Sequence, residues 1–361
     1  MAMSFVPAVP IAPSVPSSIP PTSPTAVQFR DRVRVSTPGR LHLGFLDPGA
    51  SLGRRFGSLG LVVDGPHTAL ELAFAGRPHI EAAPGLDAAE VERAAAHLAA
   101  LQAHTGLSRP LHLRLLELLP PHAGLGSGTQ LALAVGMAFT RLQGLPLDAA
   151  QVAALLGRGL RSGVGIAGFE RGGLLLDGGP QADGRPARVT SHLDFPQHWR
   201  VLLVLDPSRR GLSGAQERQA LAQLPPFPRE YAAELCHRVL MQILPGAAGA
   251  DFPTFAEGLN RMQALLGGYF APAQGGLSYT SPAVDAFMRW AGRHGDTAVG
   301  QSSWGPTAFA VLPSQEAADA LLRAAHAAGA VAPGLRLLTV QGRNRGADIQ
   351  FLAAAPAAAC A

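Results

Sequence analysis

The sequence contains no lysine, since all 29 of its Lys and Arg positions are arginine. A chain without lysine cannot form a Schiff base with a carbonyl substrate or with pyridoxal phosphate, so we expect no pyridoxal phosphate cofactor. It also lacks the lysine of a P-loop and of the protein-kinase ATP site. A GC-rich genome would favour arginine together with the abundant alanine, glycine and proline, but these exclusions hold whatever the cause.

Cysteines and long apolar runs are scarce as well. Cys236 and Cys360 cannot build a disulfide framework, which favours a reducing cytoplasm. No stretch of about 18 uninterrupted apolar residues occurs, so we expect no transmembrane helix and no membrane partner. Prolines recur from Pro7 to Pro24 without a preceding basic region, and residues 1–28 are therefore expected to be a disordered proline-rich extension rather than a signal peptide.

Aromatic residues make up only 6% of the chain, and the formal net charge is only +4. The pI of about 9.8 partly reflects the high pKa of arginine, and the longest basic runs are the pairs Arg54-Arg55 and Arg209-Arg210. This pattern does not favour nucleic-acid binding. Because the planar guanidinium fork suits phosphates and carboxylates, we expect small anionic substrates instead.

Strands and helices are mixed without regular alternation, which indicates an α+β protein of two halves. The N-terminal half is expected at 29–195, the C-terminal half at 196–352, and a flexible tail at 353–361. The Pro38-Gly39 and Gly65-Pro66 pairs are expected to break the first strands. The expected strands are 32–36, 41–46, 59–63, 68–74, 111–118, 172–177, 199–205, 307–312, 335–341 and 347–352. The expected helices are 87–104, 129–142, 148–160, 229–243, 252–266, 282–294 and 315–328.

A glycine-rich loop from Pro120 to Gly128 lies between an expected strand and an expected helix. Glycines let backbone N–H groups approach an anion, and a helix N-terminus supplies unpaired donors with a favourable dipole. Ser127 and Thr129 add hydroxyl donors. The alternative is a glycine-rich turn that only connects the two elements.

The loop resembles the proline-led Gly-Leu-Gly-Ser-Ser motif of the GHMP kinase superfamily, which includes galactokinase, homoserine kinase and mevalonate kinase. Gly124 to Ser127 match this motif, and Gly128 replaces its second serine. Those kinases carry a catalytic aspartate in a segment that begins with Ser-Gly, whereas the corresponding stretch here is Ser162 to Gly165, with glycine where the aspartate would be expected. The resemblance therefore implies a phosphate cradle without a base for phosphoryl transfer.

Two further segments resemble the β-ribofuranosylaminobenzene 5′-phosphate synthase family. The first is Pro38 to Asp47, followed by Gly53 to Gly60, and the second runs from Gly267 to Thr307 and includes Gly300-Gln301-Ser302-Ser303-Trp304. With the glycine loop, the resemblance extends from Val33 to Phe351. It implies a GHMP-kinase-like two-domain fold, with a ribosomal-protein-S5-like N-terminal half and a ferredoxin-like C-terminal half, and a homodimer.

The family resemblance also implies a reaction. Phosphoribosyl pyrophosphate, bound with Mg²⁺, condenses with 4-aminobenzoate or 4-hydroxybenzoate, and CO₂ and pyrophosphate leave, as the first committed step of methanopterin biosynthesis. The sequence does not distinguish the two benzoates. The alternatives are an ATP-dependent small-molecule kinase of the same superfamily and a non-catalytic ligand-binding protein of the same fold.

The candidate site residues are assigned on the motifs. The sequence offers no assignment of metal ligands. Each group also has a structural alternative: helix capping for the loop, solvent-facing salt bridges for the arginines, and a core position for the histidine and the tryptophan. The catalytic candidates are Arg40, His42 and Asp47. The substrate-binding candidates are Arg54, Arg55, Gly124, Gly126, Ser127, Gly128, Thr129, Gln301, Ser302, Ser303, Trp304 and Asn344, with Glu217 as a weaker candidate.

Overall fold

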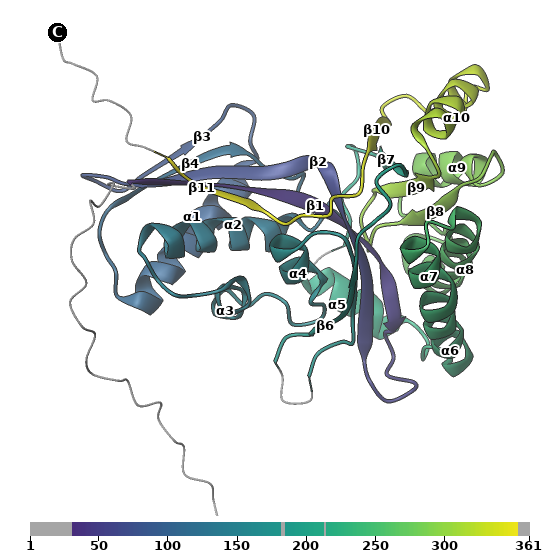
Figure 1. The fold of residues 1–361 in the computed structure, drawn as a ribbon, viewed down its shortest axis with the longest axis horizontal. Coiled ribbons are helices and arrows are strands. Elements are labelled where there is room, and N and C mark those ends of the chain that lie inside the picture. Colours follow the sequence, from purple (N-terminus) through teal and green to yellow (C-terminus); the bar gives the residue numbers. More distant parts are fainter. Residues whose placement is uncertain (1–30, 182–184, 213, 353–361) are drawn as a thin grey trace, which may run out of the picture.

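Two long antiparallel strands, β1 (Arg32–Asp47) and β2 (Phe56–Phe74), run through both halves of the molecule (Figure 1). The computed structural model describes residues 31–181, 185–212 and 214–352, so the expected extension at 1–28 and tail at 353–361 lie outside the described residues. The part of this ribbon far from the turn that joins its strands packs against α1 (Ala88–Thr105) and α2 (Ser127–Leu142). The part near that turn packs against the helices of the C-terminal half. The ribbon therefore connects the two halves.

The sequence predicts four short strands here, and that prediction is wrong. Strand pairing passes through both expected breaks, because Pro38 faces His67 and Arg40 faces Val62 across the ribbon. Residues 63–66 of β2 therefore bulge opposite Gly39, and the Asp64 amide donates to the Gln341 carbonyl oxygen at 2.9 Å. A bulge bends a strand and re-aims its side chains without ending it.

The first sheet has seven strands in the order β11-β1-β2-β4-β3, with β5 paired to β2 and β6 paired to β5. Leucines at alternate positions of β4 face the helices that cover one side of this sheet, as strand geometry requires. The remaining strands are β3 (His79–Ala82), β4 (Leu111–Glu117), β5 (Leu174–Asp177), β6 (Val189–Leu193) and β11 (Asp348–Leu352). The covering helices are α1 (Ala88–Thr105), α2 (Ser127–Leu142), α3 (Ala149–Leu155) and α4 (Val164–Glu170).

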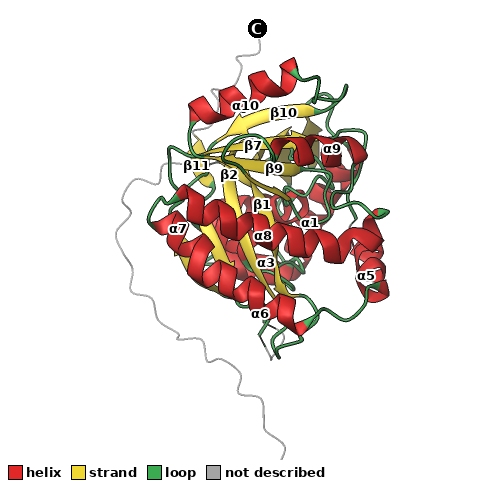
Figure 2. Cartoon of the chain, turned by 90° about the vertical axis from the view of Figure 1, so that its right-hand side faces the viewer, coloured by secondary structure: helices red, strands yellow, loops and turns green. Residues whose placement is uncertain are grey.

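The second sheet has four strands in the order β10-β7-β9-β8 and is buried on both faces. Figure 2 shows the helices of the C-terminal half in front of the β1–β2 ribbon. The strands of this second sheet are β7 (Arg200–Leu205), β8 (Ala298–Gln301), β9 (Ala308–Leu312) and β10 (Arg336–Val340). The helices of this half are α5 (Gly214–Gln223), α6 (Arg229–Arg238), α7 (Leu244–Ala248), α8 (Phe252–Phe270), α9 (Pro282–Ala291) and α10 (Gln315–Ala327), with a π-helical turn at Val239–Ile243.

The α+β class is confirmed, and the differences from the sequence are local. Elements missed are β3, β6, β8, α4, α5 and α7; the three strands are only four or five residues long, and α4 contains two glycines. β11, which the sequence places in the C-terminal half, pairs with β1 of the first sheet. Among the described residues, no helix is long and apolar enough to cross a membrane.

Candidate functional site

The bulged part of β1 holds the two loops of the candidate site. The Arg40 amide donates to the Leu125 carbonyl oxygen at 3.1 Å. Two residues along, the His42 amide donates to Ser302 Oγ at 2.9 Å, and that hydroxyl donates to the Gly124 carbonyl oxygen at 2.7 Å. The strand therefore brings the glycine loop and the 301–304 loop together, although they lie far apart in the sequence.

The glycine loop ends in a helix whose first turn has no side-chain cap. Gly124 and Gly126 have φ values of +86° and +77°, which favour glycine, and Gly126 is the N-cap of α2. The first turn of α2 contains no acidic residue. The N-terminus of α2 therefore points unneutralised donors and the positive end of its dipole out of the loop, as an anion requires.

The Arg40 guanidinium lies between two glycines. A Cβ on Gly126 would come within 3.0 Å of Arg40 Nε, and a Cβ on Gly165 would come within 2.9 Å of Arg40 Nη2. Arg40 Nε is buried without a hydrogen-bond partner, and the side chain forms no ion pair with any residue that the structure describes. Burial lowers the pKa of Arg40 to about 10, against the opposing charge of Asp177, so the group stays positive at neutral pH. Arg40 is a desolvated cation without a direct counter-ion.

Asp177 fixes the segment that presents Gly165. Its carboxylate accepts from Ser162 Oγ at 2.9 Å and from the amides of Gly163 and Gly179 at 2.8 Å each. Burial raises the pKa of Asp177, although these hydrogen bonds oppose the shift. All these donors are local, so Asp177 positions the start of α4 rather than neutralising Arg40 by contact.

A second arginine, which the sequence did not single out, lies on the other side of the loop. Arg158 Nη1 is 3.8 Å from where a Cβ on Gly128 would stand, and Nη2 is 3.4 Å from His97 Nε2. Its Nε is buried without a hydrogen-bond partner. Burial, and then the charges of Arg158 and Arg93, lower the pKa of His97 to about 4, so a neutral imidazole faces this guanidinium. Two cations therefore flank the helix start.

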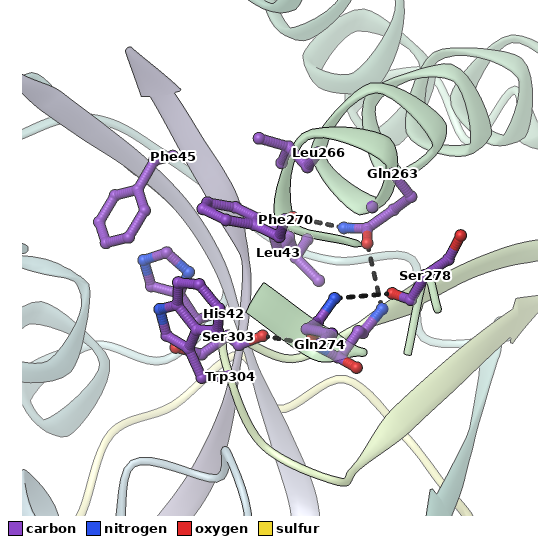
Figure 3. Close-up of a pocket in the computed structure, with 13 residues that line it drawn as sticks. His42, Leu43, Phe45, Gln263, Leu266, Phe270, Gln274, Ser278, Ser303 and Trp304 are labelled. Carbon is purple, nitrogen blue, oxygen red and sulfur yellow. Dashed lines mark hydrogen bonds between the residues drawn. The ribbon is translucent and has the colours of Figure 1, made fainter. Parts of the chain in front are cut away.

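An apolar pocket that includes His42 lies between β1 and α8 (Figure 3). Phe45, Leu266, Phe270 and Trp304 supply its apolar walls, and the rings of Phe270 and Trp304 are 4.7 Å apart between centroids. The amide groups at its rim belong to Gln263, Gln274 and Gln301. Such a pocket suits a small aromatic ring with a polar substituent.

His42 joins the pocket to the cationic loop. It follows Arg40 by two positions, so both side chains point from the same face of β1. Its two ring nitrogens are buried without hydrogen-bond partners, and its ring packs edge-on against Phe45 at 4.5 Å between centroids. Burial, and then the charge of Arg40, lower the pKa of His42 to about 3, so the imidazole is neutral at pH 7. A neutral imidazole offers one donor and one acceptor to a bound molecule.

The 301–304 loop lines the pocket and is tied into it. Gln301 Nε2 donates to Gln274 Oε1 at 2.7 Å and to the Ser303 carbonyl oxygen at 2.9 Å, while its Oε1 accepts from the Thr280 amide at 2.8 Å. Ser302 is fully buried in the contact between the two loops. Trp304 is only 3% exposed, so it is a wall of the pocket and also part of the core.

Asp47 does not lie with His42. It ends β1, five positions away, which corresponds to about 16 Å along a strand. Its Oδ2 accepts from the Leu52 amide at 2.8 Å and from Ser51 Oγ at 3.1 Å, so it closes the turn that follows. The structure therefore does not support the hypothesis that Asp47 shares a catalytic site with His42.

Four further candidates also lie outside the pocket. Arg54 and Arg55 are exposed on the turn between β1 and β2, and Arg55 Nε donates to the Pro48 carbonyl oxygen at 3.1 Å. Asn344 bonds the backbone of Phe195 in both directions, at 2.8 and 2.9 Å. Glu217 pairs with Arg161 at 2.7 Å. These contacts are structural, and they give no reason to place the four side chains against a ligand.

Sequence reasoning missed Arg158, Asp177 and Gln263. Arg158 lies between two glycines just beyond α3, and Asp177 ends an otherwise apolar strand before two more glycines. Charged residues beside glycines at the end of an element are a signal that could have been used. Gln263 lies on a half-buried turn of α8 and has no such signal, since only the packing of α8 on β1 brings it to the pocket.

Comparison with known proteins places this geometry in a family. Residues 90–173 match the family described as GHMP kinases N terminal domain, and residues 243–331 match GHMP kinases C terminal. A protein of Archaeoglobus fulgidus named beta-ribofuranosylphenol 5′-phosphate synthase is 32% identical over 333 residues, which cover 88% of this chain and 99% of that protein. The chain belongs to the β-ribofuranosylphenol 5′-phosphate synthase family. This confirms the family resemblance found in the sequence motifs, where the family was named after its aminobenzene product.

Further relatives agree with the synthase family and with its superfamily fold. The synthase of the same name from Methanothermobacter thermautotrophicus is 29% identical and covers 87% of the chain and 97% of its own length. The crystal structure of homoserine kinase from Cytophaga hutchinsonii superposes with a TM-score of 0.66 at 18% identity, covering 91% of this chain and 100% of that chain. At that identity the likeness shows the fold alone, which is the expected GHMP kinase fold.

Proposed function

We propose that the protein condenses phosphoribosyl pyrophosphate with 4-aminobenzoate or 4-hydroxybenzoate, releasing CO₂ and pyrophosphate, as a step of methanopterin biosynthesis. The observation that carries this proposal is the placement of Arg40 and His42 on one face of β1. Arg40 lies at a loop suited to phosphate, and His42 lies in a pocket suited to an aromatic ring. A reaction between an anionic donor and an aromatic acceptor needs these two environments next to each other.

The proposed reaction needs no redox cofactor and no protein base. The bond between ribose C1 and the pyrophosphate oxygen breaks and leaves an electron-poor C1. The ring carbon that bears the carboxylate then bonds to C1, assisted by electrons from the para amino or hydroxyl group. The bond to the carboxylate breaks, CO₂ leaves, and its electron pair restores the aromatic ring. Atoms and charge balance in these steps. None of them needs a Schiff base, which agrees with a chain that contains no lysine.

The chain’s own residues would act by binding charge. Two cationic positions flank the start of α2, with Arg40 over Gly126 and Arg158 beside Gly128. The donor also carries two anionic groups, a phosphate at C5 and the pyrophosphate that leaves from C1. Preorganised donors in a desolvated site stabilise the charge that develops on a leaving group. We assign Arg40, which shares a face of β1 with the pocket residue His42, to the leaving pyrophosphate, and Arg158 to the phosphate at C5.

The neutral His42 would orient the acceptor. Among the residues that line this pocket, His42 is the one histidine that could bond the carboxylate or the para substituent of a benzoate. A histidine with a pKa of about 3 is neutral at pH 7, so His42 would act by hydrogen bonding rather than by its charge. The walls formed by Phe270 and Trp304 would hold the ring against C1.

Magnesium enters this proposal as part of the donor. Among the described residues, three or more possible metal ligands gather only on β3 and β4, away from the glycine loop. Asp177 has its carboxylate engaged by three local donors. The residues at the loop therefore do not form a metal site of their own. Mg²⁺ usually reaches such sites through substrate phosphates and water, and we derive no step of the protein from it.

Gly165 bears on the kinase alternative. The resemblance in sequence expects the kinase aspartate where Gly165 stands, and here the Arg40 guanidinium occupies the space beside that glycine. An aspartate at this position would accept a proton in a kinase, whereas the Arg40 guanidinium beside Gly165 would bind an anion. This observation favours the synthase over the kinase.

The test is release of labelled CO₂. Purified protein is incubated with Mg²⁺, phosphoribosyl pyrophosphate and carboxyl-labelled 4-aminobenzoate or 4-hydroxybenzoate, and we expect CO₂ and pyrophosphate in equal amounts from one of the two acids. Comparing the two acids assigns the para substituent. A folded protein that releases no CO₂ from either acid, or that forms ADP from ATP and an alcohol, would overturn the proposal.

A further inference from the structure

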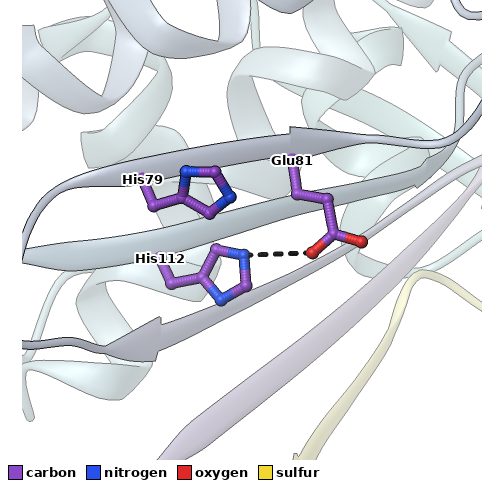
Figure 4. A group of neighbouring side chains, drawn as sticks. All are labelled: His79, Glu81 and His112. Carbon is purple, nitrogen blue, oxygen red and sulfur yellow. Dashed lines mark ion pairs between the residues drawn. The ribbon is translucent and has the colours of Figure 1, made fainter.

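Three side chains of metal-ligating type meet on the outer face of the first sheet (Figure 4). His79 and Glu81 lie two positions apart on β3, so they share a face, and His112 of β4 is paired directly with His79. One ligand atom from each residue lies within 4.8 Å of the other two. The two imidazole rings are 5.0 Å apart between centroids.

The cluster faces solvent, on the side of the sheet away from the helices. In β4 the leucines at 111 and 113 are buried toward the helices, while His112 and Arg114 point the other way. The turn at 75–77 forms an open hollow against His79 and His112. An ion bound there would have room for water molecules to complete its coordination.

Two cations near the cluster oppose binding of a metal ion, while one carboxylate oxygen of Glu81 stays clear of them. Glu81 Oε1 accepts from Arg114 Nε at 3.2 Å, and Arg77 lines the same hollow, so two cations reduce the attraction for a metal ion. Glu81 Oε2 points instead toward His112, at 3.3 Å from its Nε2. That nitrogen is buried yet makes no hydrogen bond of good geometry. The carboxylate can therefore keep Arg114 on one oxygen and offer the other to a metal ion.

We propose that His79, Glu81 and His112 form a site for a divalent transition metal ion of the zinc class, which links the edge strand β3 to β4. Two imidazole nitrogens and one carboxylate oxygen are ligands of Zn²⁺, whereas Mg²⁺ and Ca²⁺ prefer oxygen alone. Tetrahedral Zn²⁺ with bonds of about 2.1 Å holds its ligand atoms about 3.4 Å apart. His79 and Glu81 are exposed, so a small change of their side-chain torsions would bring the three atoms to this spacing without movement of the strands.

The consequence of the site is local. β3 has four exposed residues and, among the described strands, pairs along one edge with β4, so it is a weakly held edge strand of this sheet. A metal ion bound to both strands would slow their separation. The proposal is independent of the synthase activity, because the cluster lies away from the glycine loop and the pocket.

The experiment is titration of the full chain, without a histidine tag, with zinc chloride in a non-chelating buffer. We expect one ion per chain by calorimetry, and slower hydrogen exchange of the amides in 79–82 when zinc is present. His79→Gln and His112→Gln should each weaken zinc binding at least ~10-fold, since each removes one of three ligands. Because these positions face solvent, both variants are expected to fold.

His67→Gln is the matched control. His67 Nε2 lies 3.4 Å from Glu117 on a neighbouring strand, the same pair of residue types without a third ligand. We expect this variant to bind zinc as tightly as the wild-type chain. Zinc affinity unchanged in both His79→Gln and His112→Gln, no binding by the wild type at 100-fold excess zinc, or equal binding of Mg²⁺ would each overturn the proposal.

Discussion

Arg40 and Arg343 are both largely buried arginines, yet their surroundings are opposite. Arg343 bonds Asp64 and Asp348, each at 2.9 Å, and also donates to the Gly346 carbonyl oxygen. Arg40 lies between two glycines with no carboxylate in contact and with its Nε unpartnered. The satisfied arginine fastens β2 to β11, whereas the unsatisfied one has its donors available for an anion. In a chain whose basic residues are all arginine, unmet hydrogen-bonding capacity separates functional from structural positions better than residue type does.

The largest effect is expected at Arg40. In Arg40→Gln we expect kcat/KM for CO₂ release to fall by about 10²–10³-fold, because a preorganised donor to the leaving group is lost. In Arg40→Lys we expect a smaller but clear loss, since the charge stays and the planar fork is gone. Thermal unfolding should show no loss of stability, because a buried cation without a direct partner stabilises the fold little. Wild-type kinetics in both variants would place Arg40 with the structural arginines.

Gly165→Ala tests the same contact without touching the arginine. The added methyl group would lie 2.9 Å from Arg40 Nη2 and 3.0 Å from Thr129 Cγ2, so it displaces the guanidinium. We expect a loss of about tenfold in kcat/KM, in line with a misplacement of part of an ångström at a reacting centre. Gly268→Ala is the matched control, because Gly268 is also helical and a Cβ there meets nothing within 4 Å. An equal loss in both variants would show that helix rigidity, not Arg40, is responsible.

Arg343→Gln is expected to change stability rather than turnover. Removing the guanidinium leaves Asp64 and Asp348 without their shared partner and the Gly346 carbonyl oxygen without its donors. We expect the free energy of unfolding to fall by about 2–3 kcal/mol, with kcat/KM within twofold of wild type below the unfolding transition. Urea unfolding and initial rates measure the two quantities separately. A large loss of kcat/KM in a fully folded variant would remove the contrast between the two arginines.

His42 makes the native state sensitive to acid. Its pKa is about 3 in the folded chain and 6.5 ordinarily, so between these values the unfolded state binds the extra proton and stability falls as pH falls. From pH 6.5 to pH 5 this single group contributes about 2 kcal/mol of that loss. Urea unfolding of His42→Gln at the two pH values should show a correspondingly smaller difference. His104→Gln, at an exposed position, is the control, and equal behaviour of the two variants would contradict burial of an unpartnered His42.

The smallest effect is expected at the turn after β1. Arg54→Lys and Arg55→Lys should each leave kcat/KM within twofold, because both side chains are exposed and neither lines the pocket. Initial rates at low concentrations of phosphoribosyl pyrophosphate are the sensitive measurement. A tenfold rise in KM for this donor would show that the turn closes over it, and the line between the two kinds of arginine would then have to be redrawn.

Local signals predicted the regular elements well. Ser281 caps α9 with Pro282 in its first turn, as the sequence indicates, and the apolar periodicity of 87–104 became α1. Pro38-Gly39 and Gly65-Pro66 misled, because both pairs are tolerated at a bulge when long-range pairing holds the strands on either side. Those contacts join residues distant in sequence, and no short window contains them.

The candidate site divides along the same line. Motifs in the sequence pointed to the glycine loop, Arg40, His42 and the 301–304 loop, and the structure brings these together. Asp47 was grouped with His42 on closeness in sequence, which a strand converts into distance. Asn344 between two arginines looked like a binding motif, but its amide matches the backbone of Phe195 instead. Arg158 had an unused signal in its flanking glycines, whereas tertiary packing alone identifies Gln263.

The pairing of β11 with β1 has a consequence for how the chain is made. Residues 32–36 are among the first described residues to leave the ribosome, and their partners at 348–352 are among the last. Until residues 348–352 have been synthesised, this part of β1 therefore presents an open edge, and the N-terminal sheet cannot close. Arg343, just before this strand in the sequence, can meet Asp64 only at the same stage of synthesis. A nascent chain truncated before residue 343 would thus keep its glycine loop while lacking the strand that seals its sheet.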